Sequence, residues 1–397
     1  MNLMPISKTD RVQLLDICRG FAILGIFLVN APSMLGMQPA NVVRGYEGFD
    51  SVMKLGFDLL ATNKFYPIFA LLFGAGFWLF ISRAEAKGNN APRVYLRRSA
   101  VLLGFGLLHG LLLWEGDVLE FYAVHGLAML LFYKRKPKTI LIWAMSLMVT
   151  FWLVVGIVTY VIVPSATAAV TVPESYNAIS DYAAEFVARA TIYLPEKWAT
   201  TVIFLLDTLP LFLFGLFVAK TGLLQRLDAQ AGRLLPRVQW ISLASSVLLS
   251  IPIVVHYATE PVYTSSGIIL FLFIQGKALA LFYVVSLIRL HASARGKKLL
   301  SPLSYAGRMA LTNYVMHTVV TMLGVALFVE NTAALHLWQV LFYCLGVYAV
   351  QVVLSRIWLA RFSQGPLEWL WRKGTYGWKT KFKQVRSADR TEPGALP

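Results

Sequence analysis

Six polar or ionisable side chains interrupt an apolar stretch, residues 104–126, that reads GFGLLHGLLLWEGDVLEFYAVHG. They are His109, Glu115, Asp117, Glu120, Tyr122 and His125. The pattern predicts an apolar helix, a four-residue turn and a second apolar helix, and so short a turn brings His109 close to Asp117. A carboxylate orients a neighbouring imidazole and stabilises its protonated form, which is the usual general-base arrangement. We therefore predict His109 and Asp117 as the catalytic residues.

The same hairpin has a structural interpretation. His109 can be a packed, hydrogen-bonded histidine, with Glu115 and Asp117 exposed to water at the outer surface. We favour this interpretation for Glu115, and for His125 we expect a hydrogen bond between helices. Glu120 lies three residues after Asp117 on the same helical face, so we predict a structural or pathway role for it.

A second polar set lies on one face of the first apolar stretch. Asp16 and Arg19 are three residues apart, and Asn30 follows Arg19 by 11 residues, about three turns and ~16 Å further along a helix. In a functional interpretation, this face lines a substrate site or pathway. In a structural interpretation, Asp16 and Arg19 form a salt bridge where the helix enters the membrane, and Asn30 hydrogen-bonds to another helix. Arg19 and Asn30 are candidates for substrate binding, and Asp16 is a candidate pathway residue.

Later apolar stretches carry further polar residues. Lys277 lies near the middle of one stretch and needs a partner at that depth, for which Asp207 is a candidate; both are predicted pathway or structural residues. Asn313 and His317 share a helical face. Arg308 lies at the cytoplasmic end of the same stretch, where its guanidinium can bind phosphate through two hydrogen bonds or simply follow the positive-inside pattern. Arg308, Asn313 and His317 complete the substrate-binding candidates.

The composition defines the elements that must position these residues. Of 397 residues, 57% are hydrophobic and 14% charged, with a mean hydropathy of +0.63, whereas an ordinary soluble domain is about a quarter charged. A membrane-spanning helix needs roughly 20 mostly apolar residues. We count ten such stretches and predict an all-α, polytopic transmembrane helix bundle over residues 1–387, followed by a disordered tail over 388–397. Lys64, just before the second span, is expected to snorkel to the outer interface. The ten stretches begin near residues 20, 52, 99, 118, 140, 200, 240, 267, 306 and 338.

The net charge of +16 lies mainly in alternate connections between the apolar stretches. This is the positive-inside pattern, so we predict that both termini are cytoplasmic, that the turn 114–117 lies outside, and that the basic residues face anionic lipid. The lipid bilayer is the expected partner and nucleic acid is not. The first 20 residues do not resemble a cleavable signal peptide. Cys18 and Cys344 form no spaced motif, and no metal site is predicted.

Several blocks resemble the YeiB family of bacterial membrane proteins, classed as domain of unknown function 418. They read LLDICRGFAILGIFLVN, KFYPIFALLFGAGF, LLHGLLLWEGDVLEFYAVHG, GRMALTNY and GPLEWLWR, in that order. Cys18 departs from the family's usual leucine. The resemblance implies a multi-pass protein of the bacterial inner (plasma) membrane with about ten helices, in which residues from about 230 to 387 form a C-terminal block.

The YeiB group is similar to a wider superfamily of transmembrane acyltransferases, which includes the heparan glucosaminide N-acetyltransferases. By analogy, the resemblance implies acyl-CoA as the donor substrate and an envelope sugar as the acceptor. Arg19 and Arg308 would hold phosphates, His109 would deprotonate the acceptor, and Asn30 or Asn313 would polarise the acyl carbonyl. A transporter of a small polar or anionic solute and a non-catalytic membrane partner protein are the alternatives. The sequence leaves the oligomeric state open.

Overall fold

The computed structural model describes residues 8–37, 46–162, 182–260, 266–329 and 332–377; the predicted tail lies outside these ranges. Their regular structure is helical, and eight spans are long and apolar enough to cross a membrane, which confirms the predicted all-α bundle. The main helices are α1 Lys8–Met34, α2 Gly48–Leu60, α3 Phe65–Ala86, α4 Ala91–Leu112, α5 Leu119–Ala128, α6 Pro137–Ile157, α7 Tyr182–Ala188, α8 Leu194–Lys220, α9 Leu223–Thr259, α10 Ile269–His291, α11 Ala294–Arg308, α12 Ala310–Phe328, α13 Leu337–Arg361 and α14 Pro366–Tyr376.

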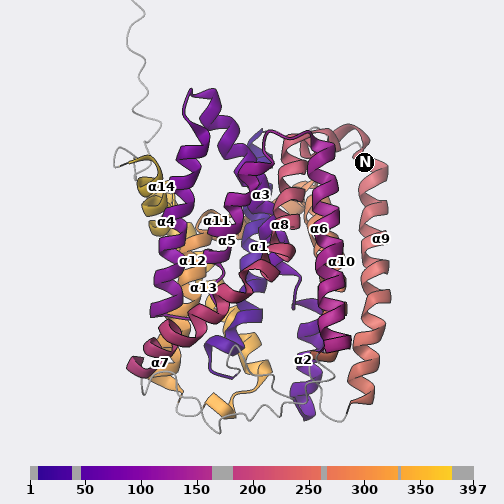
Figure 1. Ribbon diagram of the computed structural model, residues 1–397, viewed down its shortest axis with the longest axis vertical. Helices are drawn as coiled ribbons and strands as arrows, with labels where there is room; N and C mark the ends of the chain where they lie inside the picture. The colour runs from indigo at the N-terminus through magenta and orange to yellow at the C-terminus, as the bar shows by residue number, and fades with distance from the viewer. Residues whose placement is uncertain (1–7, 38–45, 163–181, 261–265, 330–331, 378–397) are drawn as a thin grey trace, which may run out of the picture.

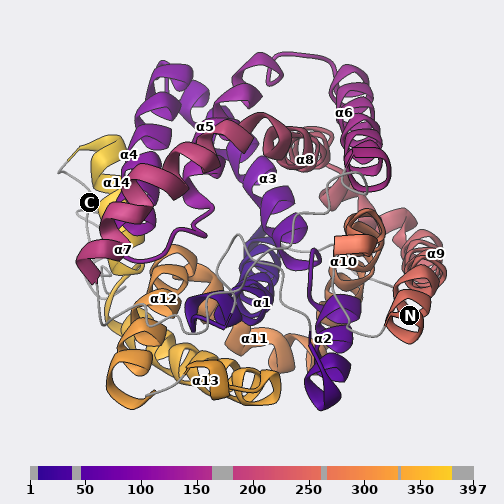
Figure 2. The same ribbon diagram turned by 60° about the horizontal axis from the view of Figure 1, so that its bottom comes forward.

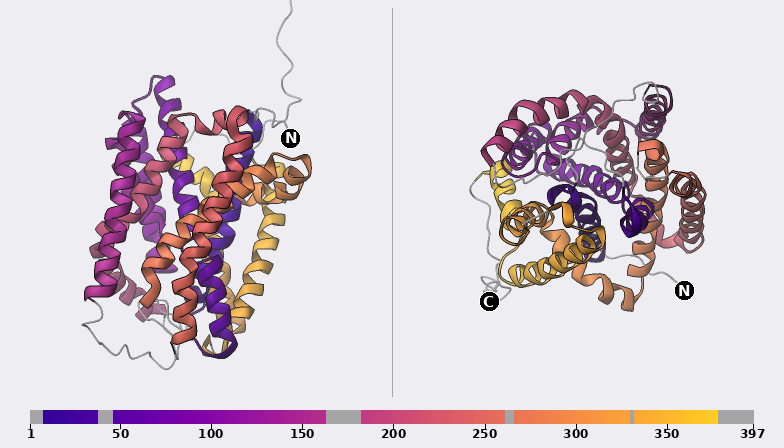
Figure 3. Two further views of the ribbon diagram at one scale, coloured as in Figure 1. Left: turned by 90° about the vertical axis from the view of Figure 1, so that its right-hand side faces the viewer. Right: turned by 90° about the horizontal axis from the view of Figure 1, so that it is seen from below.

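The eight spans come from α1, α2 with α3, α6, α8, α9, α10, α12 and α13. The other two predicted spans correspond to α4, whose first half is basic, and α5, which the 3₁₀ turn Met129–Leu131 extends. Helix α1 lies in the middle of the bundle, with the others around it (Figures 2 and 3). The first residues of α4 and all of α14 lie at one end, called here the basic end, and α7 lies at the other, called the distal end (Figure 1).

Glycines allow two helix pairs to approach closely. A Cβ atom on Gly74 of α3 would clash with the carbonyl oxygen of Phe212 in α8, and one on Gly215 of α8 would clash with that of Leu71 in α3. A Cβ atom on Gly20 of α1 would likewise clash with the backbone of α11. Small residues at helix crossings are the usual means of packing in a membrane, where lipid is as apolar as the side chains.

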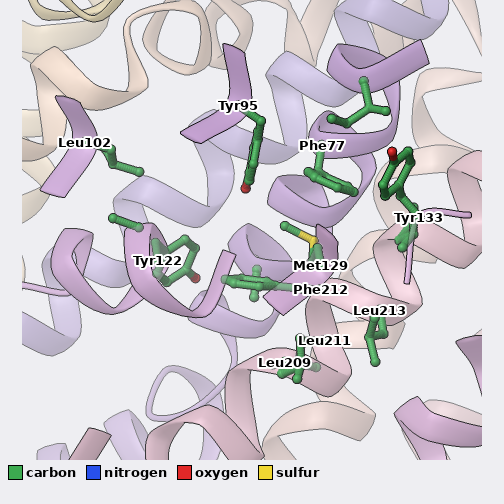
Figure 4. Close-up of a cluster of buried hydrophobic side chains, with 14 of the residues drawn as sticks. Phe77, Tyr95, Leu102, Tyr122, Met129, Tyr133, Leu209, Leu211, Phe212 and Leu213 are labelled. Atoms are coloured by element: carbon green, nitrogen blue, oxygen red, sulfur yellow. The ribbon is translucent and has the colours of Figure 1, made fainter. Parts of the chain in front are cut away.

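Aromatic side chains fill the space between α3, α4, α5 and α8 (Figure 4). The ring centroids of Phe77 and Tyr95 lie 4.7 Å apart, and those of Tyr122 and Phe212 lie 5.1 Å apart. Both pairs are edge-to-face, the arrangement that aromatic quadrupoles favour. This cluster fixes the hairpin of α4 and α5 against the rest of the bundle.

The second span is broken between α2 and α3, where Asn63 takes a φ of 63°. Lys64 is fully buried, and its Nζ donates to the carbonyl oxygen of Asp58. The carbonyl oxygens of Leu59 and Leu60 accept from Gln275 Nε2 and the Tyr283 hydroxyl, at 3.1 and 3.0 Å. The prediction that Lys64 snorkels was wrong, because its ammonium group satisfies a carbonyl that the break leaves without a helical partner.

Candidate functional site

The hairpin brings His109 and Asp117 together. His109 Nδ1 lies 2.9 Å from Asp117 Oδ1, which also accepts from the Tyr314 hydroxyl at 3.1 Å. Asp117 Oδ2 accepts from the backbone N–H groups of Leu119 and Glu120 at 2.9 and 3.4 Å, so the carboxylate also satisfies two backbone donors that the first turn of α5 leaves without helical partners. Four donors hold this buried anion in one position.

The other ring nitrogen of His109 faces a hydroxyl. Nε2 lies 3.0 Å from Thr318 Oγ1 of α12, and both side chains are buried. A carboxylate can only accept, so Asp117 accepts a hydrogen bond from the Nδ1–H group of His109. In the neutral imidazole the Nε2 lone pair is then left to accept a hydrogen bond from the Thr318 hydroxyl. A carboxylate, an imidazole and a hydroxyl thus follow one another, in the order found in hydrolase and acyl-transfer triads.

A cavity of about 980 Å³ runs along the inside of the bundle. Along α3 its lining extends from Phe65 to Arg83, which is ~27 Å at 1.5 Å per residue, close to the ~30 Å thickness of the hydrocarbon core. At its distal end the cavity reaches Asp117, whereas His109 lies behind Asp117 and outside the lining. The volume falls at the upper end of the range for ligand pockets.

The two ends of the cavity differ in charge. Four arginines and two carboxylates line the basic end, which gives it a formal net charge of +2; they are Arg19, Arg83, Arg98, Arg308, Asp16 and Glu368. Near the distal end the lining carries three carboxylates and one lysine, which gives −2; they are Glu115, Asp117, Glu196 and Lys197. A ligand with an anionic head and an uncharged tail would therefore place its head at the basic end.

Comparisons with known proteins agree with the sequence blocks. The profile of the family described as "Protein of unknown function (DUF418)" matches residues 218–378. The uncharacterised 39.9 kDa protein in the amylase 3′ region of Bacillus acidopullulyticus is 30% identical over 97% of this chain and 99% of its own length. The chain belongs to the DUF418 family. The uncharacterised proteins YxaH of Bacillus subtilis and YeiB of Escherichia coli match this DUF418 chain over 97% and 92% of its length, at 29% and 26% identity.

Part of the predicted site lines the DUF418 cavity. Asp16, Arg19, Asn30, Asp117, Asp207 and Arg308 all do. Asp16 and Arg19 form an ion pair of 2.5 Å. Asn30 is half-buried, and no described residue hydrogen-bonds to its side-chain amide. Arg308 Nη2 donates to the carbonyl oxygen of Ser363 at 3.3 Å.

Other predicted residues lie in the walls between helices. Lys277 Nζ lies 2.7 Å from Asp207 Oδ1, so the lysine has the predicted partner. Glu120 pairs with Lys197 at 3.4 Å. Asn313 Nδ2 donates to Ser355 Oγ at 3.1 Å, and the His317 ring stacks on that of Phe27 with centroids 4.0 Å apart. The last three contacts are between helices, and neither Asn313 nor His317 lines the cavity.

The structure adds residues that the sequence reasoning missed. Tyr314 and Thr318 lie four residues apart on α12, so one helical face presents both hydroxyls to the His109–Asp117 pair. That spacing is a signal visible in the sequence, although it does not say which helix the face meets. Trp371 and Glu368 of α14 line the basic end, and the short amphipathic helix that carries them has no transmembrane signal.

Proposed function

We propose that this DUF418 protein is an acyltransferase of the bacterial inner membrane that moves an acyl group from cytoplasmic acyl-CoA to an envelope acceptor such as a sugar. The observation that carries the proposal is one continuous cavity whose lining includes arginines at one end and Asp117 near the other. A long donor molecule can bind its phosphates at the basic end and extend its thioester towards the distal end.

In this proposal Arg19 and Arg308 bind phosphate groups of the donor. Asn30 lies ~16 Å further along α1, and its side-chain amide, to which no described residue hydrogen-bonds, donates a hydrogen bond to the acyl carbonyl. A donor placed where negative charge develops on that oxygen stabilises the transition state. An uncommitted polar group in a half-buried wall is what such a role requires, since a structural asparagine would already have partners.

The acceptor's hydroxyl or amine attacks the thioester carbonyl, the C–S bond breaks and a new C–O or C–N bond forms. The proton of the acceptor passes to His109 Nε2 and from there to the departing CoA sulfur. Thr318 Oγ1 lies at Nε2, and neither His109 nor Thr318 lines the cavity. The step therefore requires the wall around Asp117 to open, after which the proton moves through the Thr318 hydroxyl or the acceptor displaces it. Asp117 holds the imidazole and stabilises it while it carries the proton.

The test is release of free CoA thiol from acetyl-CoA by purified protein supplied with envelope glycans. We expect His109→Gln to slow release by about 100-fold or more, which is the contribution of a general base. His125→Gln is the matched control, because His125 is also buried in the hairpin but contacts Thr208 at 2.6 Å. Wild-type turnover in folded His109→Gln protein would rule out the general-base role.

Transport of a small anion is the second candidate. The broken second span and the buried Asp207–Lys277 pair favour it, since interrupted helices and intramembrane charges often mark solute pathways. Movement of radiolabelled phosphate through proteoliposomes without acyl-CoA would support transport. Equal flux in a folded Asp207→Leu/Lys277→Met variant would remove this pair from the pathway.

A further inference from the structure

Arg98 of α4 is held at the basic end of the cavity by an aromatic side chain from α14. The centre of its guanidinium lies 3.5 Å from the ring centroid of Trp371, with Phe80 on α3 at 5.2 Å. Trp371 Nε1 also donates to the backbone carbonyl oxygen of Arg98 at 2.8 Å. Trp371 therefore contacts both the side chain and the backbone of Arg98, which limits the orientations open to the guanidinium.

Arg98 lines the cavity, yet no described residue forms a hydrogen bond or ion pair with its guanidinium. The acidic residues at this end are already engaged. Asp16 pairs with Arg19 at 2.5 Å. Glu368 Oε1 accepts from the backbone N–H groups of Leu311 and Thr312 at 2.7 and 3.1 Å.

A guanidinium presents its N–H donors in a planar fork that matches two phosphate oxygens, and stacking on an aromatic ring leaves those donors available. A group already fixed in its binding orientation loses little entropy when the ligand arrives. The formal charge of +2 on the lining of this end calls for a ligand that carries about two negative charges.

We infer that Arg98, oriented by Trp371, binds a phosphate of a diphosphate-bearing ligand, and that Arg19 and Arg308 bind the rest of the diphosphate. The assignment rests on the proposed function only in taking that diphosphate to be part of acyl-CoA. Trp371 is a positioning residue, because it acts on the ligand through Arg98.

The experiment is calorimetric titration of the full-length protein in detergent with pyrophosphate, CoA and farnesyl diphosphate as separate probes. The variants are Arg98→Lys, Trp371→Phe and Trp371→Leu. Arg97→Lys is the matched control, because the neighbouring Arg97 is exposed, donates to the carbonyl oxygen of Gly374 at 3.3 Å and does not line the cavity.

We expect Arg98→Lys to weaken pyrophosphate and CoA binding by about 10- to 100-fold, the loss of one or two charged hydrogen bonds, and Arg97→Lys to leave both unchanged. Trp371→Phe retains a stacking ring and should bind more tightly than Trp371→Leu. Wild-type binding by folded Arg98→Lys protein would overturn the inference, as would no binding of any probe to the wild type. Should Arg98→Lys fail to fold, equal binding by the two Trp371 variants would overturn it.

The probes separate this inference from the proposed function. Arg98-dependent binding of pyrophosphate and CoA without any acyl transfer would support the phosphate site and contradict the acyltransferase. If acyl transfer and CoA binding are both the same in Arg98→Lys as in the wild type, the phosphate site is contradicted and the acyltransferase is not. Arg98-dependent binding that is strongest for farnesyl diphosphate would identify a lipid diphosphate as the ligand.

Discussion

The pair formed by Asp207 and Lys277 is a buried charge site whose removal has a calculable cost. Lys277 Nζ lies 2.7 Å from Asp207 Oδ1 and donates to the Tyr66 hydroxyl at 2.7 Å; that hydroxyl in turn donates to Asp207 Oδ2 at 2.6 Å. The ammonium group also lies 4.7 and 5.4 Å from the ring centroids of Phe273 and Phe151. Three helices, α3, α8 and α10, therefore meet at one ion pair surrounded by apolar rings.

Counting partners in the part of the chain that the structure describes, Lys277→Met leaves the Asp207 carboxylate with the Tyr66 hydroxyl alone, and Asp207→Leu leaves the ammonium with no counter-charge. Breaking a buried pair from one side costs about 3–5 kcal/mol, because a buried charge remains uncompensated. Replacing both partners by apolar side chains of similar volume removes that charge and is often close to neutral. We therefore expect a coupling free energy of about 5 kcal/mol or more between the two substitutions, since the two single losses add and the double variant shows little of either.

The assay is unfolding by SDS titration of the wild type, both single variants and the double variant in mixed micelles. We expect each single variant to lose about 3–5 kcal/mol of unfolding free energy and the double variant to recover most of it. Additive losses, with the double variant the least stable, would refute the reasoning. They would mean that Asp207 and Lys277 are each stabilised by groups other than one another.

Two further predictions concern packing and the N-terminal end of α12. Gly74→Ala should destabilise the fold by about 1–3 kcal/mol, because the new methyl group meets α8 and overpacking costs that much. Gly76→Ala, with open space around the new methyl group, should stay within about 0.5 kcal/mol; equal unfolding midpoints would contradict the prediction. Burial raises the pKa of Glu368, while hydrogen bonds from Thr312 oppose the rise. Because the folded state then holds this proton more tightly than the unfolded state, its contribution to stability falls as pH rises through the raised pKa. In thermal melts from pH 4 to 7, the wild type should become less stable relative to Glu368→Gln as the pH rises. A stability difference between the two proteins that does not change with pH would contradict the prediction.

The sequence was sufficient for the parts of the fold that depend on hydrophobic length and on local spacing. Apolar runs identify the spans, and a four-residue turn is short enough to place Asp117 beside His109. Contacts between distant segments could not be predicted, since no local sequence pattern shows that Thr318 contacts His109 or that Trp371 stacks on Arg98. The snorkelling prediction for Lys64 was wrong for a related reason. The carbonyl that Lys64 binds lacks a helical partner only because the chain breaks between α2 and α3.

Some polar groups in this bundle pair with other helices, whereas others face the cavity with no hydrogen-bond partner among the described residues. Asn313 Nδ2, for example, donates to both the carbonyl oxygen of Ala306 and Ser355 Oγ at 3.1 Å, as an interhelical packing contact should. Asn30 and Arg98 line the cavity, and the described residues provide no hydrogen bond to either side chain. Helix packing alone gives no reason to place these two side chains at the cavity wall, whereas a ligand in the cavity would use them as hydrogen-bond donors. The open donors therefore favour a ligand-binding protein over a purely structural membrane partner.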